Sequence, residues 1–345
     1  MSIAEANTGA GRTDLAEGVI ADVRPHQSVT RLKSPISDPK DILVPIRKPF
    51  KSEHGQILSD KHIRVRRFGR RNGPPVFVMG GISAGRKLAG SDGWWNDQVG
   101  EGQPIDLTSH QALGIDFAPL TDERVALSPS TQARLVLMAM DELGIGKLHA
   151  LIGASYGGMV GLALGAIAPA RVNALCIISA AHKPSPLASA WRGVQRRMVE
   201  FAIKEGCAHE GLALARQLAM ITYRSSDEFE DRFLNILGPD GRSDLDKYLV
   251  SRGEAYGQTM SAKRWLSLSE AIDRCSVSPE AIKVPTTLVT CPTDQIVPKE
   301  LVTELANRLP RFTALHALPS IYGHDAFLKE PERLGGIVRS FLRTC

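Results

Sequence analysis

The chain has 345 residues, of which 43% are hydrophobic and 23% are charged, a composition typical of an ordinary globular protein. The net charge of +5 is mild. The arginine-rich stretches at 64–71 and 192–197 have no interleaved aromatic residues, so they indicate solvated faces rather than a nucleic-acid groove. No apolar run is long enough to span a bilayer, and no secretory signal is evident. The five cysteines are scattered and not at metal-ligand spacing, so we expect a cytoplasmic protein without a metal site.

Residues 1–40 are polar and lack a sustained periodicity, which predicts a flexible leader. Beyond them, short apolar segments typical of buried strands alternate with helical patterns. The strands are predicted at 62–68, 75–79, 112–117, 148–152, 172–179, 285–291 and 315–318. The helices of this part are predicted at 130–143 and 159–168. Such alternation implies an α/β fold with a mostly parallel sheet and helices on both of its faces.

The stretch 183–275 breaks this alternation. It contains several helical patterns, including 191–203, 211–220 and 227–234, and no convincing strand. We therefore expect a core formed by 41–182 and 276–345, with 183–275 as a helical lid. A lid of this kind would lie over the strand ends, where open α/β sheets bind their ligands.

Gly153-Ala154-Ser155-Tyr156-Gly157 is the most informative motif of the chain. It matches the pattern G-x-S-x-G and lies between a predicted strand and a predicted helix, which is the context in which the serine serves as a nucleophile. Small neighbours allow the tight turn that holds the hydroxyl out of the sheet. The alternative is an ordinary strand-to-helix turn, but the context favours a nucleophilic Ser155.

A serine hydroxyl becomes a good nucleophile only when a base accepts its proton and an acid orients that base. In folds with this motif, the acid and the histidine follow the serine in that order, each after a strand. Of the nine histidines, His324 is the one that fits this position, because His316 falls within a predicted strand. We predict His324 as the base.

Asp294 follows the predicted strand at 285–291 directly and is the predicted acid. Two other aspartates compete with it. Asp273 falls within a helical pattern, and Asp325 adjoins the histidine too closely to orient it. The predicted triad is therefore Ser155, Asp294 and His324.

The oxyanion that forms when the serine attacks a carbonyl needs two preorganised donors. One is expected to be the backbone N–H of Tyr156, directly after the nucleophile. The other is expected from the loop Gly80-Gly81-Ile82, with Gly81 the first candidate and Ile82 the second. The alternative for this loop is an ordinary tight turn.

Longer stretches of the chain resemble the homoserine O-acyltransferases of the α/β-hydrolase superfamily, enzymes of methionine biosynthesis. The matching stretches are Gly80-Gly81-Ile82-Ser83-Ala84, Gly93-Trp94-Trp95, Gly153 to Met159, Ile178-Ser179-Ala180-Ala181, Gly211 to Arg216, Ile221 to Ser225 and Tyr322 to Leu328. Together they run from about Val76 to Lys329, so the resemblance covers most of the chain.

The resemblance implies an α/β-hydrolase fold, a cytoplasmic homodimer and ping-pong acyl transfer from acyl-CoA to L-homoserine without a resident cofactor. It also implies substrate-binding roles. Arg216 would hold the homoserine carboxylate with the help of Tyr223, and Asp325 would hold the ammonium group. Without the resemblance, Arg216 would be taken as a helix-surface residue and Tyr223 as a core residue.

The sequence is compatible with several alternatives. A serine esterase shares the triad but needs no amino-acid clamp, a related transferase would use serine as the acceptor, and the fold could also serve as a ligand receptor or scaffold. The donor is either succinyl-CoA or acetyl-CoA. The chain is shorter than many family members between Asp116 and the helix at 130–143, which slightly favours succinyl-CoA. A succinyl group would need an additional cation, for which Arg86 is a candidate by its loop position alone.

Overall fold

The computed structural model describes residues 37–345, except residue 235. Residues 1–36, most of the expected leader, lie outside this range. The described chain is built around an eight-stranded sheet with the strand order β1-β2-β6-β3-β7-β8-β9-β10. The strands span Ser37–Pro45, His62–Gly69, Gln111–Ile115, Pro75–Met79, Ala150–Ala154, Leu175–Ile178, Thr286–Thr290 and Phe312–Ala317 in that order.

The six strands from β6 to β10 in this order are parallel, and β1 and β2 add an antiparallel edge. All seven strands predicted from the sequence are present, as are both predicted core helices, α1 (Pro129–Glu142) and α2 (Tyr156–Ile167). The predicted α/β class with a mostly parallel sheet is therefore confirmed. A short separate pair, β4 (Val99–Gly100) and β5 (Ile105–Asp106), lies in a connection.

Strand β1 was not predicted, and residues 37–40 belong to it rather than to the leader. The segment carries prolines and charged residues, and its pairing with β2 contains an irregularity between Ser37 and Lys40. Such a sequence is tolerated at the edge of a sheet, where one side of the strand needs no hydrogen-bond partner.

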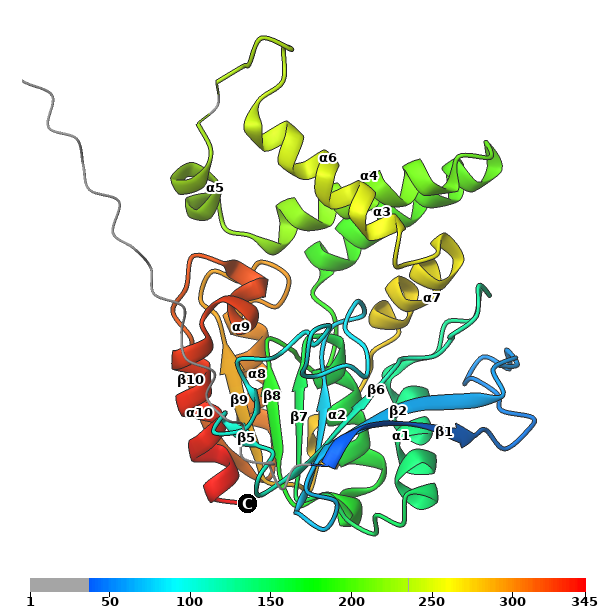
Figure 1. Ribbon diagram of the computed structural model, residues 1–345, viewed down its shortest axis with the longest axis vertical. Helices are drawn as coiled ribbons and strands as arrows, with labels where there is room; N and C mark the ends of the chain where they lie inside the picture. Colours follow the sequence, from blue (N-terminus) through cyan, green and yellow to red (C-terminus); the bar gives the residue numbers. More distant parts are fainter. Residues whose placement is uncertain (1–36, 235) are drawn as a thin grey trace, which may run out of the picture. The chain divides into compact units, whose positions relative to one another are not determined.

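Two hydrophobic clusters cover the two faces of the sheet. Alternate residues of each strand face opposite sides, so that in β3 Phe77 packs in one cluster and Val78 in the other. Helices α1, α2 and α8 (Lys299–Arg308) contribute to the first cluster. Helix α10 (Pro331–Arg343) contributes to the second. Helices therefore cover both faces of the sheet, as Figure 1 shows.

Five helices lie between β8 and β9 in the chain and gather beyond the strand ends at the top of Figure 1. They are α3 (Pro186–Lys204), α4 (Ala208–Tyr223), α5 (Ser226–Arg232), α6 (Asp244–Gly257) and α7 (Ala262–Asp273). Helices α3 and α4 contain the helices predicted at 191–203 and 211–220, and α5 covers most of the helix predicted at 227–234 but ends at Arg232, whereas α6 was not predicted individually. We call α3–α7 the helical insertion. Within residues 37–345 no helix is both long and apolar enough to cross a membrane.

Candidate active site

Ser155 lies in the turn between β7 and α2, where it is the N-cap residue with φ 53° and ψ −123°. A positive φ is uncommon for a residue with a side chain and is often found at functional sites. Two glycines make the turn possible. A Cβ at Gly153 would lie 2.5 Å from the carbonyl oxygen of Gly157, and a Cβ at Gly157 would overlap the carbonyl of Met79. The glycines of the motif therefore allow the close packing that presents the Ser155 hydroxyl.

The structure brings Ser155, His324 and Asp294 together in one hydrogen-bonded row. His324 Nε2 lies 2.8 Å from Ser155 Oγ, and His324 Nδ1 lies 2.8 Å from Asp294 Oδ2. The other carboxylate oxygen, Asp294 Oδ1, accepts hydrogen bonds from the N–H groups of Ile296 and Val297, each at 2.9 Å. The acid is thus fixed by its own loop, and the row can carry a proton from the hydroxyl to the imidazole.

The environment of His324 suits the role of a base. Burial lowers the pKa of His324, but the charge and hydrogen bond of Asp294, together with the charge of Asp325, outweigh this effect and raise the pKa above its usual value. A higher pKa makes the imidazole a stronger acceptor for the Ser155 proton.

Tyr156 opens helix α2, so its N–H has no acceptor within the helix and points toward the N-terminal side, next to Ser155. The side chain of Tyr156 instead belongs to the core. Its hydroxyl donates to the carbonyl of Leu127 at 3.0 Å, and its ring packs edge-on against Phe117 with centroids 4.9 Å apart. The backbone of this tyrosine, rather than its phenol, therefore faces the reacting group.

The loop after β3 lies against the nucleophile. A Cβ built on Gly81 would be 4.0 Å from Ser155 Oγ, and the N–H of Gly157 donates to the carbonyl of Gly80 at 2.9 Å. The two predicted sources of oxyanion donors are therefore adjacent to the hydroxyl. That Tyr156 and Gly81, or Ile82, hold an oxyanion stays a prediction.

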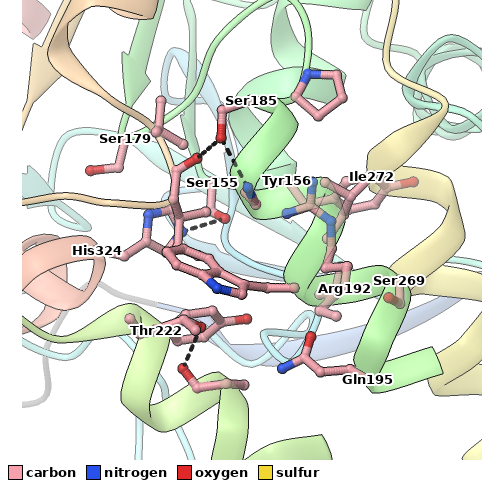
Figure 2. Close-up of a pocket in the computed structure, with 18 of the residues that line it drawn as sticks. Ser155, Tyr156, Ser179, Ser185, Arg192, Gln195, Thr222, Ser269, Ile272 and His324 are labelled. Atoms are coloured by element: carbon pink, nitrogen blue, oxygen red, sulfur yellow. Dashed lines mark hydrogen bonds between the residues drawn. The ribbon is translucent and has the colours of Figure 1, made fainter. Parts of the chain in front are cut away.

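Two cavities meet at the Ser155 hydroxyl. Both are lined by Ser155, His324, Ile82, Ser83, Arg216, Tyr223 and Ile272. The first extends among α3, α4 and α7 and includes Arg192; we call it the Arg192 cavity (Figure 2). The second extends past Trp94 to Phe327 and Leu328 and includes Asp325; we call it the Trp94 cavity.

Arg216 and Tyr223, both on α4, lie at the junction of the two cavities. The Arg216 guanidinium lies over the rings of Tyr256 and Tyr223, with its carbon 4.8 and 5.9 Å from their centroids. No acidic side chain within the described residues pairs with it. The ring of Tyr223 lies 5.4 Å from that of His324. An arginine whose N–H donors have no acidic partner, beside the reacting groups, is suited to bind a carboxylate.

Asp325 lines the Trp94 cavity but already has a partner that was not predicted from the sequence. Its Oδ2 accepts from Arg224 Nε at 3.0 Å, and Arg224 also pairs with Glu228 at 2.6 Å. In the described chain Asp325 Oδ1 has no hydrogen-bond partner, so this oxygen is available to a ligand.

Arg86 does not take the place that its loop position suggested. Its guanidinium pairs with Asp41 at 3.0 Å and with Asp116 at 2.7 Å, and it lines neither cavity. The idea that Arg86 binds a succinyl group is therefore wrong.

Arg192, rather than Arg86, lies in the cavity beside the nucleophile, although the stretch 192–197 was expected to be a solvated face. The residue is only 9% exposed and lines the cavity next to Ser155. Its Nε and Nη2 contact Asp273 Oδ1 at 3.0 and 2.6 Å, whereas its Nη1 has no hydrogen-bond partner among residues 37–345. The available signal was the spacing of Arg192 and Arg196 four residues apart, which lets both pair with Asp273.

Residues 74–331 match the family described as the alpha/beta hydrolase fold, which is well over half of the chain. Two solved structures show the same fold at low identity. Esterase E22 has a TM-score of 0.77 with 17% identity, covering 89% of this chain and 100% of that chain. A homoserine O-acetyltransferase from Bacillus anthracis has a TM-score of 0.77 with 16% identity, covering 89% and 97%. The fold and the match define the class as α/β hydrolase.

A more specific relative is the homoserine O-succinyltransferase of Xanthomonas campestris pv. campestris. It is 38% identical over 291 residues, which cover 82% of this chain and 79% of the relative. The chain therefore belongs to the homoserine O-acyltransferase family of the α/β hydrolases, and the resemblance seen in the sequence is confirmed. In the part of the chain that the structure describes, no group of three or more His, Cys, Asp or Glu side chains could hold a metal ion.

Proposed function

We propose that this chain transfers a succinyl group from succinyl-CoA to the hydroxyl of L-homoserine through an acyl-enzyme on Ser155. The observation that carries this proposal is the hydrogen-bonded row Ser155–His324–Asp294 beside Arg216, which pairs with no acidic side chain of the described residues. The homoserine O-succinyltransferase and O-acetyltransferase relatives support it.

In the first half-reaction His324 accepts the Ser155 proton as Oγ attacks the thioester carbonyl. The N–H groups of Tyr156 and of Gly81 or Ile82 stabilise the oxyanion. The carbon–sulfur bond then breaks, and the CoA thiolate leaves with the proton from His324. The acyl group remains on Ser155, so the reaction needs no resident cofactor.

In the second half-reaction homoserine enters through the Trp94 cavity. Arg216, aided by Tyr223, binds its carboxylate, and Asp325 Oδ1 accepts a hydrogen bond from its ammonium group. His324 removes the proton of the acceptor hydroxyl, which attacks the acyl carbonyl. The acyl–serine bond then breaks as Ser155 Oγ takes the proton back from His324, and O-succinyl-homoserine is released.

Arg192 favours succinyl-CoA over acetyl-CoA as the donor. Arg192 and Arg196 share the single carboxylate of Asp273, which leaves a net positive charge beside the Arg192 cavity. The unpaired Nη1 of Arg192 can donate to the terminal carboxylate of a succinyl group attached to Ser155. An acetyl group has no terminal carboxylate to accept a hydrogen bond from this donor.

The helical insertion acts as a lid in this proposal. It contributes Arg192, Arg216 and Tyr256 to the cavities, while Ser155 comes from the core. By enclosing the acyl-enzyme it limits attack by water, which any transferase of this chemistry must do.

Exposed apolar residues of the insertion support a homodimer. Leu187, Val194 and Phe201 follow one another at seven-residue intervals on α3 and share one face, and Leu214 and Ile221 do the same on α4. A second copy of the chain that packs against these exposed side chains would remove them from water.

We place the homodimer in the cytoplasm, in methionine biosynthesis. Light scattering should give twice the mass of the chain, and Phe201→Glu should yield monomers.

The function is tested by assaying homoserine and serine against succinyl-CoA and acetyl-CoA. We expect turnover with homoserine and succinyl-CoA to exceed the other three combinations. Rapid quench with succinyl-CoA alone, followed by mass spectrometry, should show Ser155 carrying the succinyl group. Absence of this adduct, or equal turnover with serine, would contradict the proposal.

A further inference from the structure

Tyr256 on helix α6 contacts two separate parts of the site. Its hydroxyl lies 2.9 Å from the hydroxyl of Ser83, in the loop that also carries Gly81 and Ile82. Its ring lies beneath Arg216, whose guanidinium carbon is 4.8 Å from the ring centroid. Tyr256 is 9% exposed and lines the Arg192 cavity. Neither the motifs nor the resemblance pointed to this residue.

We infer that Tyr256 is a positioning residue that holds the oxyanion loop through its hydroxyl and the acceptor-binding Arg216 through its ring. This inference rests on the proposed function, because it assigns both contacts to steps of that reaction. One residue of the helical insertion would thus contact both the loop that stabilises the oxyanion and the arginine that binds the acceptor.

The loop has few other attachments. The Gly80 carbonyl accepts from Gly157 N–H at its base, and the Gly81 carbonyl accepts from Ala84 N–H within the loop. Among the described residues, the bond from Ser83 to Tyr256 is the only side-chain hydrogen bond that links residues 80–84 to the helical insertion. An oxyanion donor acts only within about 2.7–3.1 Å of the oxygen, so a small shift of this loop weakens catalysis.

The contact with Arg216 has a separate consequence. A carboxylate would also fix an arginine, but it would occupy the N–H donors that a substrate needs. An aromatic face attracts the guanidinium through its π electrons and leaves those donors free in the plane of the group. The ring of Tyr256 can therefore orient Arg216 while keeping its fork available to a carboxylate.

Three variants separate the two roles. Tyr256→Phe removes the hydroxyl and keeps the ring, Ser83→Ala removes the same bond from the other side, and Tyr256→Leu removes both contacts. We expect Tyr256→Phe and Ser83→Ala each to slow acylation of Ser155 by about tenfold, with KM for homoserine changed by less than about twofold. Tyr256→Leu should in addition raise KM for homoserine by about tenfold, since it also removes the cation–π contact.

Acylation is measured as the burst of p-nitrophenol from p-nitrophenyl acetate and as CoA release from succinyl-CoA. The double variant Tyr256→Phe/Ser83→Ala should be no slower than either single variant, because all three break one bond. Additive losses, or a normal burst in Tyr256→Phe, would overturn the inference, as would an unchanged KM in Tyr256→Leu. If Tyr256→Leu does not fold, Tyr256→Phe and Ser83→Ala decide. If the wild-type protein gives a burst but no transfer to homoserine, the proposed acceptor is refuted. The burst of Tyr256→Phe and Ser83→Ala would still test the bond between Ser83 and Tyr256.

Discussion

Replacing Arg192 with methionine should change the acyl donor that the enzyme prefers. The substitution removes the unpaired Nη1 from the cavity but does not leave a buried charge alone. Asp273 keeps Arg196 Nη1 at 2.7 Å from Oδ2 and Ser189 Oγ at 2.7 Å from Oδ1. Methionine retains much of the length of the arginine stem, so we expect the variant to fold.

The magnitude follows from the hydrogen bond that is lost. A hydrogen bond to a charged group contributes about 1.5–3 kcal/mol, and about 1.4 kcal/mol corresponds to a tenfold change in rate or binding. Arg192→Met should therefore lower kcat/KM for succinyl-CoA by roughly 10- to 150-fold. Because an acetyl group makes no such bond, kcat/KM for acetyl-CoA should change by less than about threefold.

Both donors are compared by following the free thiol of CoA at saturating homoserine. Arg196→Met is the matched control, since Arg196 pairs with the same Asp273 but does not line the cavity. This control should keep the succinyl preference. Equal losses with both donors in Arg192→Met, or the same loss in Arg196→Met, would show that Arg192 acts on the fold of the insertion and not on the succinyl carboxylate.

Three further outcomes are expected. Arg216→Ala should lower kcat/KM for homoserine by about 100-fold, while hydrolysis of p-nitrophenyl acetate changes by less than about threefold; parallel losses would favour a plain esterase. The base must be neutral to act, and the raised pKa of His324 means that acylation rises with pH through a value above the usual one for histidine. Asp325→Asn removes one negative charge that raises this pKa, so the acid limb of the burst rate should move to lower pH, and an unmoved limb would contradict this coupling. Gly157→Ala should destabilise the protein by about 1–3 kcal/mol in a urea titration, because its Cβ meets the backbone at the end of β3, whereas Gly146→Ala, which has open space, should not.

The core of the site could be predicted from sequence because short-range rules fix it. A nucleophile between a strand and a helix, followed by an acid and a histidine after later strands, must emerge at one edge of a parallel sheet. Helix α1 also has local signals at both ends. Ser128 is its N-cap, Pro129 lies in its first turn, and Gly144 follows its end with φ 68°. In these places the local sequence and the global fold agree.

Contacts across the helical insertion could not be predicted in the same way. Ser83 and Tyr256 are 173 positions apart, and no periodicity relates them. Arg192 lies in an arginine-rich stretch whose composition is typical of an exposed surface. Its partner Asp273 comes from α7, a distant helix in the chain. Arg224 donates to Asp325, which lies 101 positions further along the chain, so this contact could not be predicted from local sequence either. Which face of an amphipathic helix is buried, and against what, depends on packing that spacing alone does not determine.

In the proposed mechanism the core supplies the reacting groups, and the helical insertion supplies the side chains that select the substrates. Ser155, Asp294 and His324 come from the core. The side chains assigned to the succinyl and homoserine carboxylates, Arg192 and Arg216, come from α3 and α4 of the insertion. Substitutions of Arg192 and Arg216 should therefore change which donor and acceptor are used, whereas substitutions in the row should abolish acylation with every donor. An Arg192 or Arg216 variant that lost ester hydrolysis and acyl transfer in equal measure, while remaining folded, would contradict this separation.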